Sequence, residues 1–132
     1  MVRVFVDTSA WYAYINKNEP GHGRVVAWLD GFEGRLLTSD YVFDETVTLC
    51  RRRLGHGPAV HIGSVLLDPA VVEMLTVGAE EMSEAWQLFC ARKDKMYSFT
   101  DCTSFVLMKR LGIESALTLD EDFQREGFAC VP

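Results

Sequence analysis

Short apolar segments alternate with longer helix-like segments along this chain of 132 residues. Strands are predicted at 2–6, 35–38, 71–77, 115–119 and 128–131. Helices are predicted at 9–16, 22–32, 40–54, 58–67, 79–93 and 99–110. Such alternation is typical of a parallel α/β sheet with helices on both faces. The length suits one compact domain, so we expect the whole chain, residues 1–132, to form a single α/β domain.

Apolar spacing also predicts which helix faces point inward. In the helix at 40–54, spacings of 4, 3 and 4 define one face, formed by Phe43, Val47, Cys50 and Leu54. In the helix at 79–93, the residues expected to point inward are Met82, Trp86 and Phe89. The first helix is expected to expose an apolar patch suited to a partner, formed by Trp11, Tyr12 and Tyr14.

The chain has no apolar run long enough to cross a bilayer, so we expect no membrane association. Residues 1–7 look like a short strand that ends in a charge, not a signal peptide. We therefore expect a cytoplasmic location. The cysteines form no C-x-x-C pair, so buried free thiols are expected rather than a zinc site or disulfides.

The net charge of −6 limits how the chain can bind a nucleic acid. Proteins that coat a phosphate backbone are usually basic. This chain would need a local basic patch, a metal ion or both, and its charge also suits a basic partner. Arg52, in the basic run at 51–53, follows Glu45 by seven residues on nearly the same helix face. We expect Arg52 to be either an RNA phosphate contact or a solvated residue at the helix end.

Four acidic residues stand where a parallel sheet would bring them together. Asp7 follows the first strand, and Asp120 follows the strand at 115–119. Asp101 completes an S-x-x-D capping box, and Glu45 points away from the apolar face of its helix. Ligands bind beyond the carboxyl ends of parallel strands, so we expect these side chains to line one cleft. Each acid alone also has a structural explanation, as a cap, a turn residue or a solvated charge.

Clustered carboxylates favour a bound cation. Two like charges about 4 Å apart repel by roughly 4 kcal/mol at an effective dielectric of about 20. A hard divalent ion removes that repulsion, since Mg²⁺ and Mn²⁺ prefer carboxylate and water oxygens. Such an ion also binds phosphate oxygens and activates water, which is the chemistry of phosphodiester hydrolysis.

Four local sequences carry a resemblance to a known family, in the order in which that family has them. They are Val4-Phe5-Val6-Asp7-Thr8-Ser9-Ala10, Asp44-Glu45-Thr46, Ser98-Phe99-Thr100-Asp101-Cys102 and Leu117-Thr118-Leu119-Asp120-Glu121-Asp122-Phe123. Together they resemble PIN-domain proteins, and in particular the VapC-like toxins of bacterial and archaeal toxin–antitoxin pairs. The resemblance covers nearly the whole chain and implies a parallel sheet wrapped by helices.

The same resemblance implies an endoribonuclease that uses Mg²⁺ or Mn²⁺. Asp7, Glu45, Asp101 and Asp120 would bind the metal, with Asp122 beside or in place of Asp120. The hydroxyls of Thr8, Ser9 and Thr100 would either orient the carboxylates or only cap helices. The implied partners are an RNA substrate, a small antitoxin and a second copy of the chain. The alternative function is a catalytically inactive PIN-like domain that only binds a protein or RNA.

Overall fold

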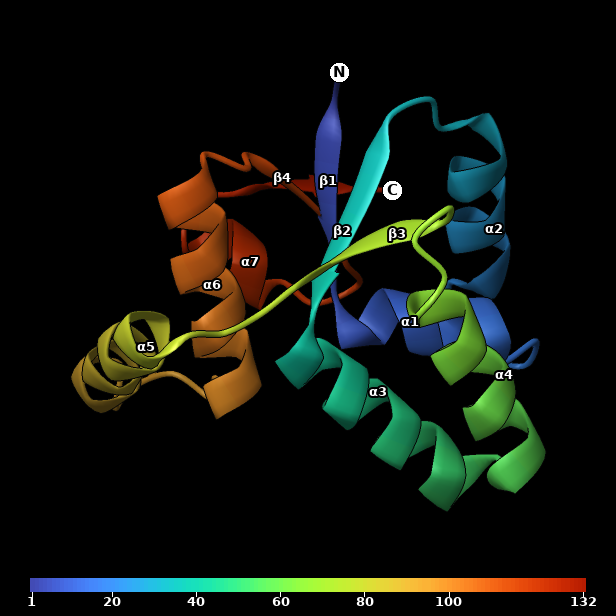
Figure 1. The fold of residues 1–132 in the computed structure, drawn as a ribbon, viewed down its shortest axis with the longest axis horizontal. Helices are drawn as coiled ribbons and strands as arrows, with labels where there is room; N and C mark the ends of the chain where they lie inside the picture. Colours follow the sequence, from blue (N-terminus) through green and yellow to red (C-terminus); the bar gives the residue numbers. More distant parts are fainter.

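Five parallel strands form the centre of the molecule in the computed structural model, which describes residues 1–132 (Figure 1). The strands are β1 (Arg3–Val6), β2 (Arg35–Ser39), β3 (Val72–Leu75), β4 (Ser115–Leu117) and β5 (Ala129–Val131). Their order in the sheet is β3-β2-β1-β4-β5, and every pair is parallel. The chain builds outward from β1 on one side and then returns to build on the other. The strand order therefore reverses between β1 and β4, and ligands of open α/β sheets bind at such a point.

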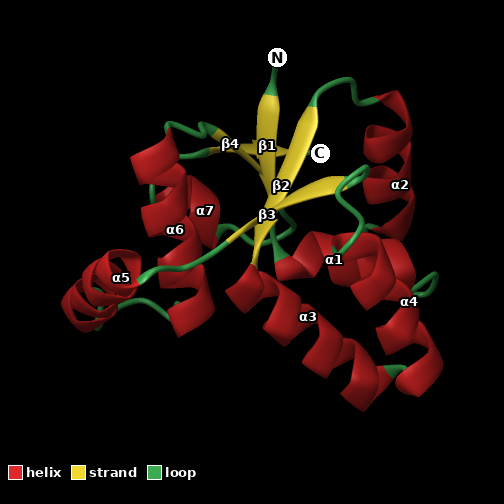
Figure 2. Cartoon of the chain, in the orientation of Figure 1, coloured by secondary structure: helices red, strands yellow, loops and turns green.

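Helices cover both faces of this sheet, as predicted (Figure 2). They are α1 (Thr8–Ile15), α2 (His22–Gly31), α3 (Asp40–Arg53), α4 (His56–Leu66), α5 (Ala79–Ala91), α6 (Phe99–Leu111) and α7 (Asp122–Arg125). Helices α5, α6 and α7 gather on one side of the sheet, and α1 and α2 on the other (Figure 1). The pair α3 and α4 extends beyond the carboxyl ends of the strands. None of the helices combines the length and the apolar character needed to cross a membrane.

The core fills the space between these layers and the sheet. Phe5 and Val6 of β1 are fully buried. On the side of α6, the ring of Phe105 meets that of Phe123 edge to face, with centroids 4.9 Å apart. On the side of α1, Trp11 is buried and its indole N–H donates to Thr38 Oγ1 at 3.3 Å. The apolar patch expected on the first helix is therefore absent, because Trp11 and Tyr12 belong to the core.

The predicted inward face of α5 is wrong. Met82, Trp86 and Phe89 are 42%, 56% and 39% exposed. Helix α5 lies at the edge of the molecule and packs on α6 through Ala85, which is fully buried. The side chains of Met82, Trp86 and Phe89 therefore face outward, and the rings of Trp86 and Phe89 stack with centroids 5.7 Å apart.

Two further predictions need correction. In α3 the fully buried residues are Val42, Thr46 and Cys50, while Phe43 and Val47 are half-buried against the core. Helix α3 packs on both α1 and α4, so its inward surface is wider than the predicted face. The cysteines are free thiols, but only Cys50 and Cys102 are buried, and Cys90 and Cys130 are exposed.

Candidate metal centre

Asp7 lies where β1 ends and α1 begins. It is the N-cap of α1, a position that favours Asp because a side-chain oxygen can accept an otherwise unpaired backbone N–H. Its Oδ2 accepts from Ser9 Oγ at 2.8 Å, Thr118 Oγ1 at 3.1 Å and Ser9 N at 3.4 Å. Ser9 Oγ also accepts the backbone N–H of Leu119 at 3.0 Å, which ties the start of α1 to the end of β4. These bonds fix the orientation of the carboxylate.

The hydroxyls around Asp7 differ in part from those expected. Ser9 binds the carboxylate, but Thr8 instead accepts from Thr46 Oγ1, inside the core. No hydroxyl bond joins Thr100 to an acid, and the backbone oxygen of Thr100 accepts from Thr103 and Ser104. Sequence reasoning missed Thr118. The signal was its position after β4, since Val6 pairs with Leu117 and the next residues, Asp7 and Thr118, therefore lie side by side.

Asp101 is held at the start of α6 by the predicted capping box. Its backbone N–H donates to Ser98 Oγ at 3.0 Å, and its Oδ2 accepts the N–H of Ser98 at 3.0 Å. The side chain is buried, because the first turn of α6 lies against the sheet edge where β1 and β4 end. The cap thus directs a carboxylate toward the loop after β4.

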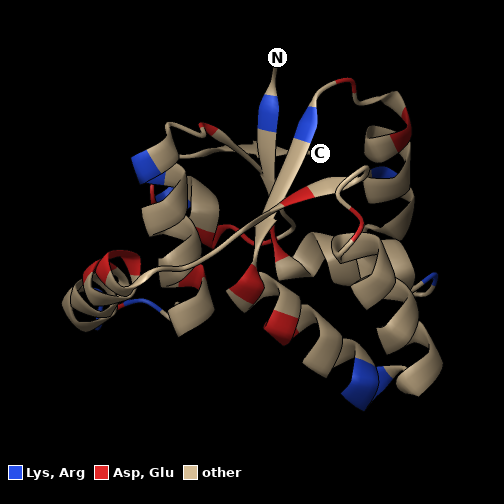
Figure 3. Cartoon of the chain, in the orientation of Figure 1, with Lys and Arg blue, Asp and Glu red and all other residues tan.

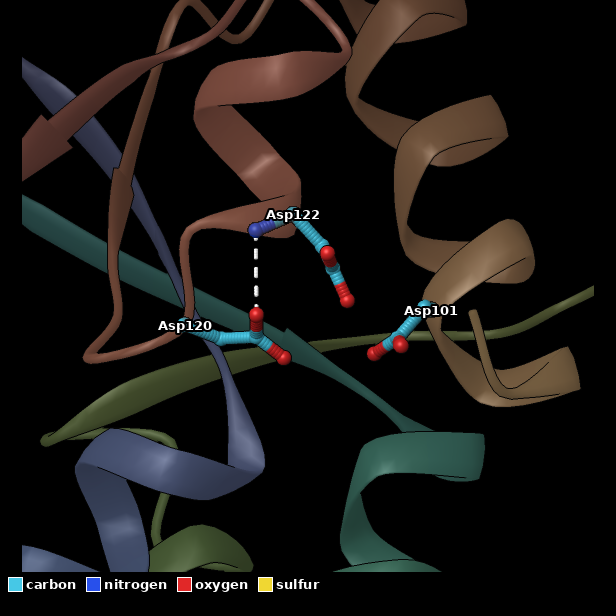
Figure 4. Close-up of side chains that lie close together, drawn as sticks. All are labelled: Asp101, Asp120 and Asp122. Carbon is cyan, nitrogen blue, oxygen red and sulfur yellow. Dashed lines mark hydrogen bonds between the residues drawn. The ribbon is translucent and has the colours of Figure 1, made fainter. Parts of the chain in front are cut away.

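Asp120 and Asp122 stand on that loop and on the short helix α7, which the sequence did not predict. The N–H of Asp122 donates to Asp120 Oδ1 at 3.0 Å, and Arg125 Nη1 donates to Asp122 Oδ1 at 2.6 Å. Asp101, Asp120 and Asp122 each offer a carboxylate oxygen within 4.8 Å of the others (Figure 4). Asp122, which the sequence offered beside Asp120 or in its place, therefore stands beside it in the tightest group of acids.

Glu45 completes the arrangement from α3. It lines the same cleft as Asp7, Asp101 and Asp120, a hollow of about 590 Å³. All four predicted acids thus meet at the carboxyl edge of the sheet. The cleft is also lined by Arg53. The predicted residue, Arg52, precedes it in the chain, is exposed and does not line the cleft. The reason is that the lining residues of α3 follow an i, i+4 row through Glu45, Leu49 and Arg53, inclined to the helix axis.

Burial and mutual repulsion make the carboxyls of Asp7, Asp101 and Asp120 hard to ionise. Burial raises the pKa of Asp7 to about 6; the charge of Glu45 adds to this rise, and bonds from Ser9 and Thr118 oppose it. Burial, followed by the charge of Asp7, raises the pKa of Asp101 to about 7. Burial, with a further contribution from Asp122, also raises the pKa of Asp120. The ionised cluster is therefore unfavourable without a compensating cation.

The donor set fits a hard divalent cation. Each of the four aspartates uses one carboxylate oxygen for the hydrogen bonds described above, which leaves the other oxygen without a protein donor. No buried side-chain polar atom in the molecule lacks a partner, so these second oxygens are accessible to solvent. Asp7, Asp101 and Asp120 line the cleft, and Asp122 groups with Asp101 and Asp120. Oriented carboxylates with one open oxygen are what Mg²⁺ or Mn²⁺ prefers.

Comparison of the sequence with known proteins identifies one family model and relatives that are named as VapC proteins. The family model described as "PIN domain" matches residues 4–129. The chain is 38% identical over 126 residues to the 23S rRNA-specific endonuclease VapC20 of Mycobacterium tuberculosis, covering 95% of both chains. It is 30% identical over 117 residues to ribonuclease VapC26 of the same species, covering 89% of this chain and 86% of the relative.

Solved structures agree with this result. The crystal structure of Mycobacterium tuberculosis VapC20, described as a sarcin–ricin loop cleaving toxin, superposes with a TM-score of 0.91 at 36% identity over 96% of both chains. DNA-bound VapBC from Salmonella typhimurium matches with a TM-score of 0.72 at 18% identity, covering 98% of this chain and 97% of that one, and so shares the fold. On these grounds the chain belongs to the PIN-domain family and, within it, to the VapC-like proteins.

Proposed function

We propose that this protein is a metal-dependent endoribonuclease, the toxin of a toxin–antitoxin pair. The observation that carries the proposal is the convergence of acids at one sheet edge: Asp7, Asp101 and Asp120 line the cleft, and Asp122 groups with Asp101 and Asp120. Each of these aspartates has one carboxylate oxygen without a protein donor. Relatives of this length and similarity are named as ribonucleases, which favours catalysis over binding alone. We expect it to act in the cytoplasm, where its RNA substrate would be found.

Each acid has a distinct place in the proposed mechanism. Asp101, Asp120 and Asp122 would hold Mg²⁺ or Mn²⁺ with their open oxygens, and Asp7 and Glu45 would complete the site from α1 and α3. The bound ion would supply charge neutralisation at the scissile phosphate and activation of water. Ser9 and Thr118 would orient Asp7, and Ser98 would orient Asp101, by the hydrogen bonds they make. No Ser, Cys or His nucleophile is required.

The substrate class follows from the relatives, and we propose ribosomal RNA. The decisive experiment incubates the protein with 23S rRNA, and with a sarcin–ricin loop oligonucleotide, in Mn²⁺, in Mg²⁺ and in EDTA. We expect metal-dependent cleavage in which water attacks the phosphorus and the 3′ oxygen leaves, so that the products carry a 5′-phosphate and a 3′-hydroxyl. Asp7→Asn is the matched inactive control, since an Asn oxygen can still accept from Ser9 and Thr118. Cleavage in EDTA, or a 2′,3′-cyclic phosphate product, would rule out this mechanism.

The alternative, an inactive PIN-like module, gives a different result in the same assay. It would bind RNA or a protein with metal present but leave every RNA intact. The exposed aromatic face of α5 suits such binding, but no residue of α5 lines the acidic cleft.

We further propose two protein partners. A small antitoxin would block the cleft with a basic segment, because the cleft gathers carboxylates in a chain of net charge −6. Co-expression with the adjacent open reading frame, followed by pull-down and the cleavage assay, tests this. A second copy of the chain would form a homodimer, for which the exposed apolar face of α5 offers a surface.

A further inference from the structure

Two arginines line the acidic cleft without an acidic partner. Arg24 belongs to α2 and Arg53 to the last turn of α3. The ion pairs of the molecule use other cations, namely Arg35, Arg92, Lys95, Arg110 and Arg125. Both guanidinium groups therefore remain available to a ligand, within a cleft whose other charged groups are carboxylates.

Arg53 is held against the wall of the cleft. Its guanidinium carbon lies 5.4 Å from the centroid of the Tyr12 ring, a cation–π arrangement. Tyr12 is itself buried, and its hydroxyl accepts from Asn16 Nδ2 at 3.2 Å, so the ring is a fixed support. Arg52 has no such contact and does not line the cleft. The chain thus offers an oriented arginine beside an unoriented one.

The two arginines stand at different parts of the cleft. Along α3, acidic residues occupy the half near the sheet and basic residues the far end (Figure 3). From Glu45 to Arg53 the helix rises about 12 Å, or roughly three to four nucleotide steps at about 3.4 Å per strand. A second hollow of about 170 Å³ adjoins the cleft at Arg24. Asp120 lines both hollows, whereas Arg53 lines only the cleft.

We infer that Arg24 and Arg53 bind RNA phosphates on either side of the one that is cleaved. A guanidinium group can donate two parallel hydrogen bonds to the oxygens of one phosphate, whereas a carboxylate repels the phosphate. The two contacts would hold a strand across the carboxylates of Asp101 and Asp120 despite the acidity of the chain. This inference rests on the proposed ribonuclease function and identifies the backbone subsites of the same cleft.

The test measures kcat/KM for cleavage of the RNA in Mn²⁺ over a series of KCl concentrations. Each phosphate contact on a single strand contributes about −0.7 to the slope of log affinity against log salt. Arg24→Gln and Arg53→Gln should each flatten the slope by about 0.7, a loss of about fivefold at about 0.1 M salt. Arg53→Lys should keep the slope, because it keeps the charge.

Arg52→Gln is the matched control, since it removes the same charge from the neighbouring position of α3. The inference is overturned if Arg52→Gln and Arg53→Gln change the salt slope equally. It is also overturned if Arg53→Gln lowers the melting temperature but leaves the salt slope unchanged. The second outcome would mean that Arg53 only packs on Tyr12. Failure of the proposed function looks different, because the unmodified protein would then leave the RNA intact in Mn²⁺.

Discussion

The carboxylate of Asp101 serves the fold and the acid cluster with different oxygen atoms. Oδ2 accepts the backbone N–H of Ser98 and so caps α6, while the other oxygen stays open to the cleft. The capping oxygen stabilises the helix, but the charge is buried among other acids and costs free energy. One pKa unit corresponds to about 1.4 kcal/mol, so ionised Asp101 destabilises the metal-free fold by on the order of 4 kcal/mol.

Asp101→Asn should therefore raise the melting temperature of the protein in EDTA while abolishing RNA cleavage. The amide oxygen of Asn can still accept the N–H of Ser98, so the cap survives and only the repulsion is lost. Thermal unfolding followed by circular dichroism measures the change. Ser98→Ala is the control, because it removes the cap acceptor for Asp101 N and should destabilise by about 1 kcal/mol. A lower melting temperature for Asp101→Asn would contradict this account.

The stability of the metal-free protein should depend on pH through Asp7 and Asp101. Their raised pKa values, about 6 and about 7, mean that the folded state holds more protons than the unfolded state above about pH 4. Their stabilising contribution is thus full below about pH 4 and is lost as the pH rises through 6 and 7. In EDTA, the drop in melting temperature from pH 5 to pH 8 should be larger for the unmodified protein than for Asp7→Asn. Adding Mn²⁺ at pH 8 should recover the loss, and equal drops in both proteins would refute the prediction.

Among the elements, α7 is the shortest helix and depends most on its surroundings. Glu126 follows it, with a side chain only 6% exposed. That carboxylate accepts from Arg92 Nε at 3.0 Å and from Tyr97 Oη at 2.9 Å, and the charge of Arg92 and these bonds lower the pKa of Glu126 against the effect of burial. Because Arg92 and Tyr97 flank the connection between α5 and α6, this cluster ties α7, and with it Asp122, to the rest of the fold.

Glu126→Gln should weaken both the fold and the binding of Mn²⁺. Arg92 donates to both carboxylate oxygens, so the amide NH₂ of Gln would face a guanidinium N–H in either orientation, and we expect a loss on the order of 1–2 kcal/mol. Denaturant unfolding measures the stability, and calorimetric titration with Mn²⁺ measures the affinity. Arg110→Gln is the control, since it breaks ion pairs between α6 and α5 away from α7. If both variants bind Mn²⁺ as tightly as the unmodified protein, Glu126 does not position Asp122.

The elements also show what could be predicted from sequence. The caps at Asp7 and Asp101 depend on neighbours a few residues away, so both were visible in the sequence. The bond from Thr118 to Asp7 spans 111 residues and requires knowing that β4 pairs with β1. Helix α7 has four residues, too few for a periodic signal. The apolar spacing of α5 predicted a helix correctly. Spacing alone cannot show whether the apolar face of that helix packs on the core or faces the solvent.

At the scale of the whole molecule, the exposed face of α5 is a departure from a self-contained fold. Met82, Trp86 and Phe89 lie on one surface, and Phe99 at the start of α6 contacts both aromatic rings. Contiguous exposed apolar groups of this kind mark protein interaction sites. This surface therefore favours the proposed association of two copies.

Trp86→Ser should shift the protein toward a monomer, because Trp is a common energetic centre of interfaces. Light scattering over a range of concentrations measures the mass. Val60→Ser on α4 is the control, since Val60 is similarly exposed, at 52%, but lies on a different helix. A monomeric unmodified protein at high concentration would refute the prediction, as would equal effects of the two substitutions.

The central place of β1 has a consequence for the time at which the cleft comes into being. The strand made first, β1, pairs on one side with β4, which is one of the last segments to be made. Most of the chain likewise lies between Asp7 and Asp122. At about 5–20 residues per second, roughly 6–23 s of translation separate the two residues. Until then β1 has an unpaired edge and the acid cluster is incomplete. A ribosome making this protein therefore meets no assembled cleft on its own nascent chain until synthesis is nearly finished.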